Sequence, residues 1–346
     1  MASLDPVAGT ADELSALLRE WDADADPGPL VIVTSGSTGE PKRVRLSRDA
    51  LRASADASHD VLGGPGQWVL NLPATYVAGV QVLFRSVRAG TEPVVQNGSL
   101  TETVRAMTGE RRYVSLVPTQ LVRLLGEHGP DLHALTTFDA VLVGGGPLDP
   151  AVRERAERAG IAVVQTYGMS ETCGGCVYDG HPLPGVAVRI AEDGEVLLAG
   201  PVLFDGYLDA DGQPDEPRTS AVMDGGWLCT DDLGTLDDDG RLRITGRRDQ
   251  VILSGGVNVP GPAVERMLAA HPAVADVAVV GRPDPEWGQA VVAVVVPAGE
   301  PPALDALRDL VEPRAWAPRV LVLTGALPRT DRGKVDLVAV RGLAHA

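Results

Sequence analysis

Short apolar runs alternate with helical stretches through the first half of the chain, and this alternation restricts the fold more than any other feature. The runs have the length of buried strands, and residues with a helical spacing of apolar positions follow them. The apolar runs are residues 30–33, 68–72, 113–117, 140–143 and 161–164, and the helical stretches include 11–21, 47–61, 118–125 and 150–159. Strands that alternate with helices predict a mostly parallel sheet, so we expect an α/β fold.

The pattern of the sequence changes twice further along the chain. After about residue 182, short apolar segments are separated by Gly, Asp and Pro turns, which indicates an antiparallel β-rich region. From Asp249 onward, the order helix, strand, strand, helix, strand predicts a small α+β domain of about 100 residues. We therefore expect a large domain at 1–248, with a β-rich subdomain at 182–248, and a small domain at 249–346.

Charge and hydropathy exclude several functional classes. The chain has 30 Lys and Arg against 47 Asp and Glu, and its net charge of −17 should repel nucleic acid and anionic membranes. Any anionic ligand must therefore be held by local groups. The longest apolar run, residues 290–296, is far shorter than the roughly 20 residues of a spanning helix, and the first residues lack the pattern of a signal peptide. We expect a cytoplasmic protein without a membrane span, and the sequence leaves a homo-oligomer open.

The three cysteines do not suggest a chemical function. Cys173, Cys176 and Cys229 are an odd number without the density of a disulfide framework, as is typical of a reducing compartment. Cys173 and Cys176 form a CxxC pair, but a zinc site needs two further soft ligands, and only His181 lies close in the sequence. We interpret the pair as incidental, with neither a zinc site nor a redox function.

The residues after the first buried strand carry the strongest functional signal. They form a loop of nine residues, Thr34-Ser35-Gly36-Ser37-Thr38-Gly39-Glu40-Pro41-Lys42. Two glycines let backbone N–H groups turn toward one point, four hydroxyls add donors and the lysine adds a positive charge, which predicts a cradle for a polyphosphate. The loop is not a Walker A motif, in which Lys directly follows the second Gly. A surface hairpin without a ligand is the less favoured interpretation.

Further motifs follow this phosphate loop in a fixed order. They are Gly144-Gly145-Gly146, Thr166-Tyr167-Gly168-Met169-Ser170-Glu171, Thr230-Asp231-Asp232, Gly246-Arg247-Arg248-Asp249 and Thr330-Asp331-Arg332-Gly333-Lys334. Together with the phosphate loop, this series resembles the motifs of the adenylate-forming superfamily of acyl-CoA and aryl-CoA synthetases, luciferases and peptide-synthetase adenylation domains. The resemblance implies an AMP-forming ligase that uses ATP, Mg²⁺ and CoA to convert a carboxylic acid into a thioester.

The resemblance also implies a role for each motif. Glu171 offers the single carboxylate that suits Mg²⁺, which also takes substrate phosphates and waters. Asp232 can accept two hydrogen bonds from a ribose diol, as carboxylates do in other nucleotide sites. Lys334 would join the substrate carboxylate to the α-phosphate and offset the charge of the transition state. A solvated loop glutamate, a turn aspartate and a surface lysine are the alternative interpretations.

The remaining positions also follow from the resemblance. Ser170 joins Glu171 and Lys334 in the catalytic set, and Asp249 is the hinge about which the small domain turns. Nucleotide contacts are expected from Thr34, Ser35, Gly36, Ser37, Thr38, Gly39, Lys42, Gly144, Gly145, Gly146, Thr166, Tyr167, Gly168, Asp232 and Arg247, and Gly255 and Gly256 would line the path of the CoA pantetheine. A ligand-free turn is the alternative for each glycine run, and a surface ion pair is the alternative for Arg247.

The nature of the acid depends on a finer resemblance. Residues 72–86, 115–121 and 165–172 look most like the o-succinylbenzoate–CoA ligases of menaquinone biosynthesis. Such an acid has a second carboxylate that needs a cation, and Arg85 and Arg123 are the candidates, with Tyr76 as a further pocket residue. Surface arginines on helices are the alternative interpretation.

Some features depart from the family pattern and leave other functions open. The phosphate loop begins about 30 residues into the chain, so most of the N-terminal region of full-length members is missing. Asp231 replaces the Gly of the family's TGD segment, and Cys229 stands where many members have Arg. Alternative functions are an adenylating enzyme for another aryl or acyl acid, with CoA or a carrier protein as acceptor, or an inactive nucleotide-binding relative.

Overall fold

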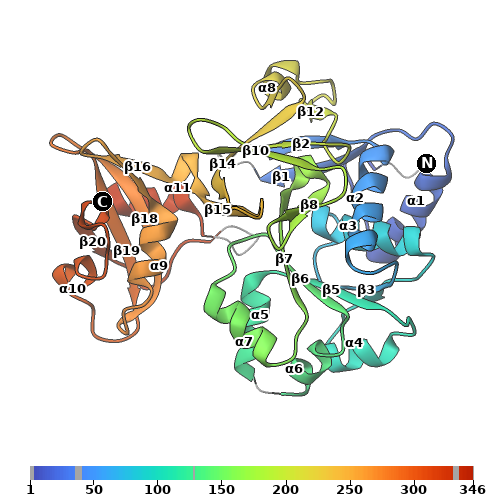
Figure 1. Cartoon of the computed structure of the whole chain (residues 1–346), viewed down its shortest axis with the longest axis horizontal. Helices are drawn as coiled ribbons and strands as arrows, with labels where there is room; N and C mark the ends of the chain where they lie inside the picture. Colours follow the sequence, from blue (N-terminus) through green and yellow to red (C-terminus); the bar gives the residue numbers. More distant parts are fainter. Residues whose placement is uncertain (1–3, 36–40, 128, 330–334, 346) are drawn as a thin grey trace. The chain divides into compact units, whose positions relative to one another are not determined.

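The chain folds into two compact units, and the computed structural model describes residues 4–35, 41–127, 129–329 and 335–345 (Figure 1). The first unit comprises residues 1–189, 197–229 and 236–242, and the second comprises 190–196, 230–235 and 243–346. The predicted α/β class, with a large N-terminal part and a small α+β part, is confirmed. The domain boundary after residue 248 stays a prediction, because the two units are defined by contacts and not by motion.

A seven-stranded sheet lies at the centre of the first unit. Its strands are β3 (Gln67–Leu70), β4 (Val94–Val95), β5 (Arg112–Leu116), β6 (Ala140–Val143), β7 (Val163–Met169), β8 (Gly174–Tyr178) and β9 (His181–Pro182). The order is β4-β3-β5-β6-β7-β8-β9, with parallel pairing up to β7 and antiparallel pairing from β7 to β9. The mostly parallel sheet expected from the sequence is therefore present.

Helices cover both faces of this sheet (Figure 1). One face carries α2 (Arg48–Val61) and α3 (Val77–Ala89), and the other carries α4 (Leu100–Ala106), α5 (Pro118–Glu127), α6 (Pro130–Leu135) and α7 (Pro150–Arg158). Alternate strand residues divide between the faces, as the pleat requires. Val69 and Val114 pack in the core with α4 to α7. Their neighbours Trp68 and Tyr113 contact each other at 4.9 Å between ring centroids, and Trp68 lies under Arg85 of α3.

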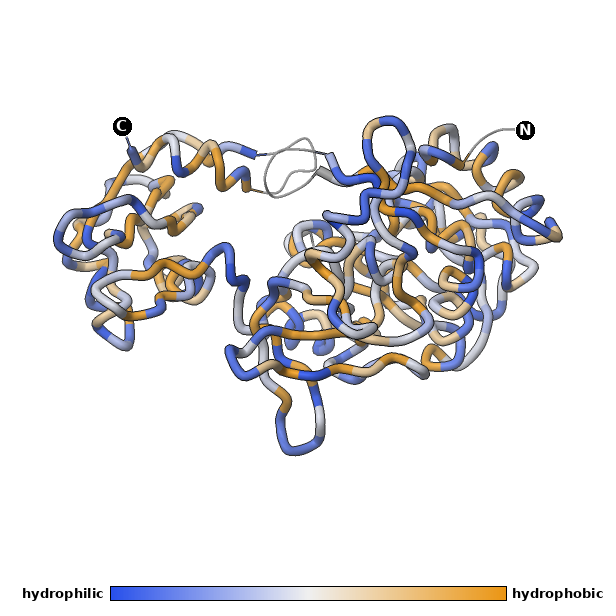
Figure 2. Tube along the Cα trace, turned by 90° about the horizontal axis from the view of Figure 1, so that it is seen from above, coloured by the Kyte–Doolittle hydropathy of each residue, from blue (hydrophilic) through white to orange (hydrophobic). Residues whose placement is uncertain are grey.

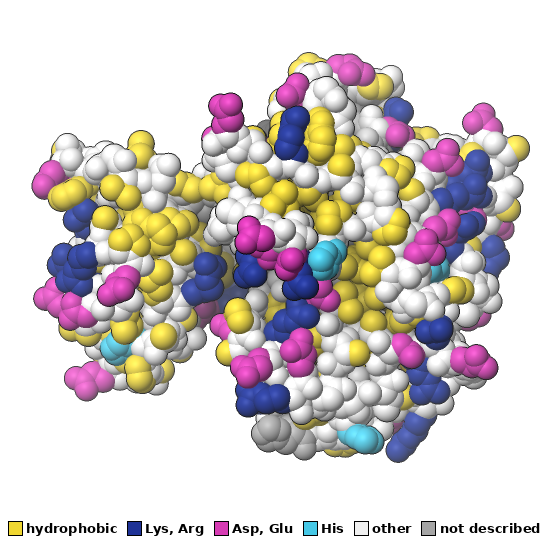
Figure 3. Space-filling model, viewed as in Figure 1, with side chains coloured by type: hydrophobic (Ala, Val, Ile, Leu, Met, Phe, Trp, Pro, Cys, Tyr) yellow, Lys and Arg dark blue, Asp and Glu magenta, His cyan; other side chains and the backbone are white. Residues whose placement is uncertain are grey.

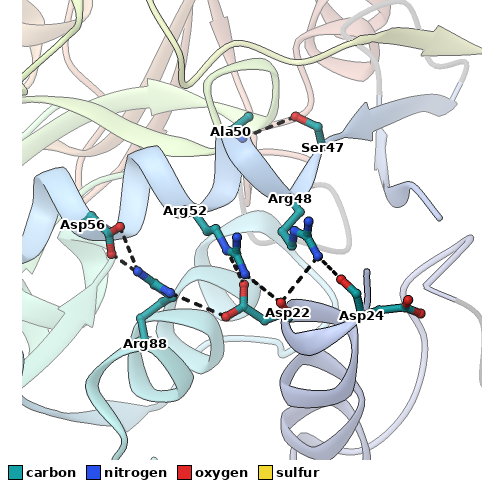
Figure 4. Close-up of polar contacts among 8 residues, drawn as sticks. All are labelled: Asp22, Asp24, Ser47, Arg48, Ala50, Arg52, Asp56 and Arg88. Carbon is teal, nitrogen blue, oxygen red and sulfur yellow. Dashed lines mark hydrogen bonds and ion pairs between the residues drawn. The ribbon is translucent and has the colours of Figure 1, made fainter. Parts of the chain in front are cut away.

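The first helix, α1 (Ala11–Ala23), is fastened at both ends. At its start a capping box is formed, since the Thr10 hydroxyl accepts the Glu13 N–H and the Glu13 carboxylate accepts the Thr10 N–H at 2.8 Å. At the other end, Asp22 forms ion pairs with Arg52 of α2 at 2.6 Å and with Arg88 of α3 at 3.6 Å (Figure 4). These contacts hold α1 against α2 and α3.

A three-stranded sheet carries the two ends of the phosphate loop. Its order is β1 (Leu30–Ser35), β2 (Pro41–Leu46) and β12 (Gly206–Leu208), and the strands are antiparallel. The register places Thr34 opposite Lys42. β12 comes from the region that the sequence assigned to the β-rich subdomain, so its pairing with β2 was not predicted.

A further sheet contributes residues to both units. It contains β10 (Ala187–Ile190), β11 (Glu195–Ala199), β13 (Met223–Asp224), β14 (Trp227–Leu236) and β15 (Leu242–Arg247), in the order β10-β11-β14-β13 with β15 beside β14. The short helix α8 (Glu216–Ser220) lies between β12 and β13 in the sequence. The short strands expected after residue 182 are therefore present.

The second unit is a five-stranded sheet between helices. Its strands are β16 (Val251–Ser254), β17 (Val257–Pro260), β18 (Val274–Asp284), β19 (Gly288–Pro297) and β20 (Val320–Leu323), and its helical segments are η2 (Arg248–Gln250), α9 (Gly261–Leu268), α10 (Leu304–Arg308), η3 (Arg314–Trp316) and α11 (Leu337–His345). Along β19, Val291 and Val295 pack in the core that includes residues of α9 and α10, whereas Val292 and Val294 pack with α11. The hairpin β16–β17 and helix α11 were not predicted.

Hydropathy and charge are distributed as expected for folded units with a buried interior. Hydrophobic stretches run through the interior of each unit, and hydrophilic stretches follow the outer loops (Figure 2). Acidic and basic side chains are interspersed on the face of the first unit in Figure 3. Within the described residues, no helix has the length and apolar character needed to cross a membrane.

His59 of α2 gives the first unit a pH-dependent stability. Its side chain is 6% exposed, and its pKa is lowered from 6.5 to about 4, mainly by burial and also by the charge of Arg85. The folded protein therefore binds a proton at His59 less readily than the unfolded chain does. This contribution to stability is complete above pH 6.5 and is lost as the pH falls toward 4.

We predict that His59→Gln removes this pH dependence. The free energy of unfolding of the wild type should fall, relative to that of the variant, by on the order of 3 kcal/mol between pH 7 and pH 4. Urea denaturation followed by tryptophan fluorescence measures the difference at each pH. Parallel pH profiles for the two proteins would contradict the assignment.

Candidate nucleotide site

The first glycine motif and the signature strand lie side by side at the carboxyl ends of parallel strands. β6 and β7 are paired with Val143 opposite Gln165, so Gly144 follows β6 just beside Thr166. A Cβ at Gly144 would lie 2.3 Å from the Thr166 hydroxyl oxygen, which only glycine avoids. Ligands of open α/β sheets bind at this edge. The predicted nucleotide motifs at 144–146 and 166–168 are therefore brought together.

A tight reversal after β7 positions Ser170 and Glu171. The chain turns through η1 (Ser170–Thr172) into β8, and a Cβ at Gly168 would lie 2.0 Å from the carbonyl oxygen of Gly174. The Met169 N–H donates to the Thr172 hydroxyl at 2.9 Å, and that hydroxyl donates to the Gly174 carbonyl at 2.7 Å. The fold thus fixes the turn that presents Glu171.

Glu171 is held by a residue that the sequence analysis missed. The hydroxyl of Tyr207 on β12 donates to Glu171 Oε1 at 2.7 Å, and the Phe204 N–H donates to the Glu171 carbonyl at 2.9 Å. The Nζ atom of Lys42 lies 5.4 Å from the centroid of the Tyr207 ring. The lysine of the phosphate loop and the glutamate of the signature strand therefore share one neighbour.

Most of the phosphate loop lies outside the described residues. Strands β1 and β2 place Thr34 and Lys42 opposite each other at its two ends, as expected for a loop that returns on itself. Gly36, Ser37, Thr38 and Gly39 lie outside the part of the chain that the structure describes. Their contacts to phosphate stay predictions.

In the second unit, Arg247 joins two of the predicted site carboxylates. Its Nη1 lies 2.8 Å from Asp232 Oδ1 and its Nε lies 3.0 Å from Asp249 Oδ1. Asp232 is buried and its backbone N–H donates to the Thr230 hydroxyl at 3.1 Å. Burial alone would lower the pKa of Arg247, but the charges of Asp232 and Asp249 outweigh it and raise that pKa. Arg247 is therefore a permanent cation beside the predicted ribose carboxylate.

Asp231, which stands where the family motif has glycine, has a left-handed backbone conformation. Its φ is +59°, in the left-handed region that favours glycine, and its N–H donates to Glu195 Oε1 at 2.9 Å. Aspartate tolerates this region better than most residues do. Aspartate can therefore occupy this left-handed position within β14.

The predicted CoA and lysine motifs differ in what the structure describes. Gly255 and Gly256 form the turn between β16 and β17 with φ of +60° and +77°, and a Cβ at Gly255 would lie 2.7 Å from the ring of Trp287. The geometry of this turn requires glycine whether or not a ligand binds there. Lys334 lies outside the described residues, and its role stays a prediction.

The cysteine pair belongs to the packing of the first unit. Cys173 and Cys176 are fully buried, and burial raises the pKa of both thiols, that of Cys176 to about 12. The Cys173 carbonyl accepts from Gln81 Nε2 at 2.7 Å. Among the residues that the structure describes, no three His, Cys, Asp or Glu side chains are grouped as metal ligands.

The two arginines predicted to hold a second carboxylate lie on opposite faces of the main sheet. Arg85 on α3 is 3% exposed, donates to the Tyr178 hydroxyl at 3.1 Å and lies 5.0 Å above the Trp68 ring, so it is not a surface arginine. Arg123 on α5 is exposed. Tyr76 is the N-cap of α3. Arg85 and Arg123 cannot both bind one carboxylate.

The chain belongs to the family of AMP-binding enzymes. Residues 8–208 match the AMP-binding enzyme family, and residues 263–334 match the AMP-binding enzyme C-terminal domain. The resemblance inferred from the order of the motifs is therefore confirmed. The predicted class, an adenylate-forming, AMP-forming acid–CoA ligase, agrees with the family and with the names of the relatives.

The chain is similar to named proteins and to proteins of known structure. A probable 2-succinylbenzoate–CoA ligase from Mycobacterium tuberculosis (strain H37Rv) is 44% identical in an alignment of 344 positions, and the alignment covers 95% of this chain and 88% of that protein. The o-succinylbenzoate CoA synthetase (MenE) from Bacillus subtilis, in complex with its acyl-adenylate intermediate, is 29% identical with a TM-score of 0.78, over 90% of this chain and 68% of that chain. The amide bond synthetase McbA from Marinactinospora thermotolerans is 32% identical with a TM-score of 0.77, over 92% and 72% of the chains.

The conformation of Asp231 leads to a test by two substitutions. Asp231→Gly relieves the left-handed strain but adds freedom to the unfolded chain, so we expect stability within about 1 kcal/mol of the wild type. Asp231→Val places a β-branched residue in the same conformation and should destabilise by roughly 1 to 3 kcal/mol. Chemical denaturation measures both changes. An equal loss in the two variants would show that the backbone conformation is not what this position requires.

Proposed function

We propose that this chain is an ATP-dependent acid–CoA ligase that acts on o-succinylbenzoate, the acid of the menaquinone pathway. The observation that carries the proposal is the arrangement of Glu171 and Lys42 around Tyr207, in the same unit as the glycine motif of 144–146. A carboxylate and an ammonium group so placed suit a metal-bound polyphosphate. The identity of the acid is supported by the names of the relatives described above.

The first unit supplies the groups for the phosphates. Glu171 Oε1 is engaged by Tyr207, and one carboxylate is what Mg²⁺ takes when it also binds phosphates and waters. Mg²⁺, when bound, would neutralise charge on the phosphates. The B. subtilis synthetase has also been solved with ATP and a magnesium ion, at a TM-score of 0.76. Lys42 adds positive charge over the ring of the same tyrosine, and Thr166 and Tyr167 follow the β6–β7 pairing at the same sheet edge as Gly144.

The second unit supplies the groups for the ribose and the hinge. Asp232 is buried and oriented by Arg247, so its carboxylate can accept hydrogen bonds from a ribose diol. The acid would attack the α-phosphate and pyrophosphate would leave. The CoA thiol would then attack the acyl carbon, lose its proton and expel AMP. In this scheme Lys334 holds the acid against the α-phosphate in the first step, and rotation at Asp249 withdraws it before the second.

Arg85 is the stronger candidate for the second carboxylate of the acid. It is a buried cation, and no acidic side chain within the described ranges lies at ion-pair distance from it. A buried charge without a counter-ion favours the binding of an anion. Arg123 is exposed to solvent, so its charge does not need a bound anion.

An acid panel tests the proposed substrate. With ATP, Mg²⁺ and CoA, o-succinylbenzoate should release pyrophosphate and give a thioester by mass spectrometry. The analogue 4-oxo-4-phenylbutanoate lacks the ring carboxylate and should show kcat/KM lower by about 100-fold or more, because the cation of the site is left unpaired. Equal kcat/KM for both acids would contradict recognition of a dicarboxylate.

The similarity to an amide bond synthetase raises the alternative that an amine, and not CoA, accepts the acyl group. The acid panel also tests this alternative. Amines and a carrier protein replace CoA in parallel reactions. Acyl adenylate that forms without CoA and is consumed only by an amine or by the carrier protein would contradict the ligase assignment and leave the adenylation step in place.

The role of Lys334 separates the two half-reactions. We predict that Lys334→Ala lowers acid-dependent pyrophosphate release by at least about 100-fold, because the transition state loses its bridging charge. Thioester formation from supplied acyl adenylate should stay close to the wild-type rate. Arg332→Ala, which removes a neighbouring charge, is the control. Equal loss of both half-reactions in Lys334→Ala would contradict a lysine that acts in the first step alone.

A further inference from the structure

Tyr207 connects two motifs that are far apart in the sequence. Its side chain is 2% exposed, and its hydroxyl donates to Glu171 Oε1 at 2.7 Å. Its ring lies 5.4 Å from Lys42 Nζ, within the range of a cation–π interaction. One buried side chain thus touches both the carboxylate and the ammonium group of the proposed phosphate site.

The fold fixes Tyr207 independently of Glu171. β12 pairs with β2 so that Tyr207 lies opposite Val44, and the Tyr207 N–H donates to the Thr219 hydroxyl at 2.9 Å. Gly206 has a φ of +131°, and a Cβ there would approach the Thr219 hydroxyl to 3.0 Å. Strand pairing, a backbone hydrogen bond and a required glycine therefore set the position of the ring before any contact with Glu171.

The chemistry of the contact suits a carboxylate that must still bind a cation. A phenol hydroxyl donates one hydrogen bond and has no net charge, so it orients Glu171 without neutralising it. Within the described ranges, no donor lies at hydrogen-bond distance from Glu171 Oε2. An arginine or lysine in the same place would compete with the metal ion. Tyrosine leaves the charge of the carboxylate available.

We propose that Tyr207 is the positioning residue of the Mg²⁺–ATP site, which it assembles by holding Glu171 through its hydroxyl and Lys42 through its ring. This rests on the proposed function, in which Glu171 binds the metal ion. Groups that orient metal ligands from outside typically change metal affinity by 10- to 100-fold. The alternative is a tyrosine that only packs, against Phe204 at 4.9 Å between ring centroids.

Removal of the hydroxyl separates these two roles. Tyr207→Phe keeps the ring, its packing and its face toward Lys42 but loses the bond to Glu171. We expect Mn²⁺ affinity in the presence of ATP, measured by electron paramagnetic resonance, to fall about tenfold. Tyr113→Phe is the matched control, because Tyr113 is also buried and the single proton of its hydroxyl is shared between the carbonyl oxygens of Leu62 and Gly64, both at 2.9 Å. Equal Mn²⁺ affinity in the two variants would overturn the proposal.

A double-mutant cycle tests whether Tyr207 acts through Glu171. In a Glu171→Gln background, Tyr207→Phe should change Mn²⁺ affinity by less than twofold, because the charged ligand that it orients is already gone. A loss of the same size in both backgrounds would mean that Tyr207 acts on overall stability, and would overturn the proposal.

A second variant covers the case in which Tyr207→Phe does not fold. Site-specific 4-aminophenylalanine at position 207 keeps the ring and an uncharged N–H donor toward Glu171. We expect its Mn²⁺ affinity in the presence of ATP to stay within about threefold of the wild-type value, because Glu171 keeps a donor. A loss of about tenfold in this variant would overturn the proposal.

Because Mn²⁺ affinity is measured without acid turnover, the test of Tyr207 can fail or succeed independently of the test of ligase activity. A wild type that binds Mn²⁺ with ATP but releases no pyrophosphate with any acid contradicts the proposed function alone, and the loss of Mn²⁺ affinity in Tyr207→Phe still supports the positioning role. A wild type that binds no Mn²⁺ with ATP overturns both.

Discussion

The register between β6 and β7 is the constraint on which the predicted nucleotide motifs of the first unit, residues 144–146 and 166–168, depend. It sets Val143 opposite Gln165 and thereby brings Gly144 so close to Thr166 that no side chain fits between them. A slip of one residue would turn every side chain of β7 to the other face of the sheet. The buried valines of both strands oppose that slip, because they pack in the core with α4 to α7. Core packing therefore determines how closely Gly144 and Thr166 approach each other.

The sequence predicted what depends on local signals and missed what depends on partners that are distant in the chain. β6 matches the expected run 140–143, and α2 lies within the expected helical stretch 47–61, because short apolar runs and helical spacing are read within a few residues. β12 has only three residues, and its place beside β2 is decided by a partner far along the chain, so Tyr207 gave no local signal. The burial of Arg85 could not be predicted from the sequence either, since a helix that is covered on several sides has no charged face in its sequence pattern.

Despite the net charge of −17, two cations among the predicted site residues, one in each unit, are held in place by neighbouring groups. Arg247 is held by Asp232 and Asp249, and Lys42 lies over the Tyr207 ring. Side chains that are already fixed lose little conformational entropy on binding.

The two ion pairs of Arg247 differ in strength, and this difference suits a hinge at Asp249. The Asp249 side chain is 40% exposed, so its pair with Arg247 contributes at most about 1 kcal/mol, whereas the side chain of Asp232 is 9% exposed and losing its partner would leave a buried charge. Arg341 of α11 also donates to the Asp249 carbonyl at 3.2 Å, on the exposed side. A change of backbone angles at Asp249 would therefore break weak, solvated contacts first. The pair between Arg247 and Asp232 can persist through such a rotation, so Asp232 would keep its orientation.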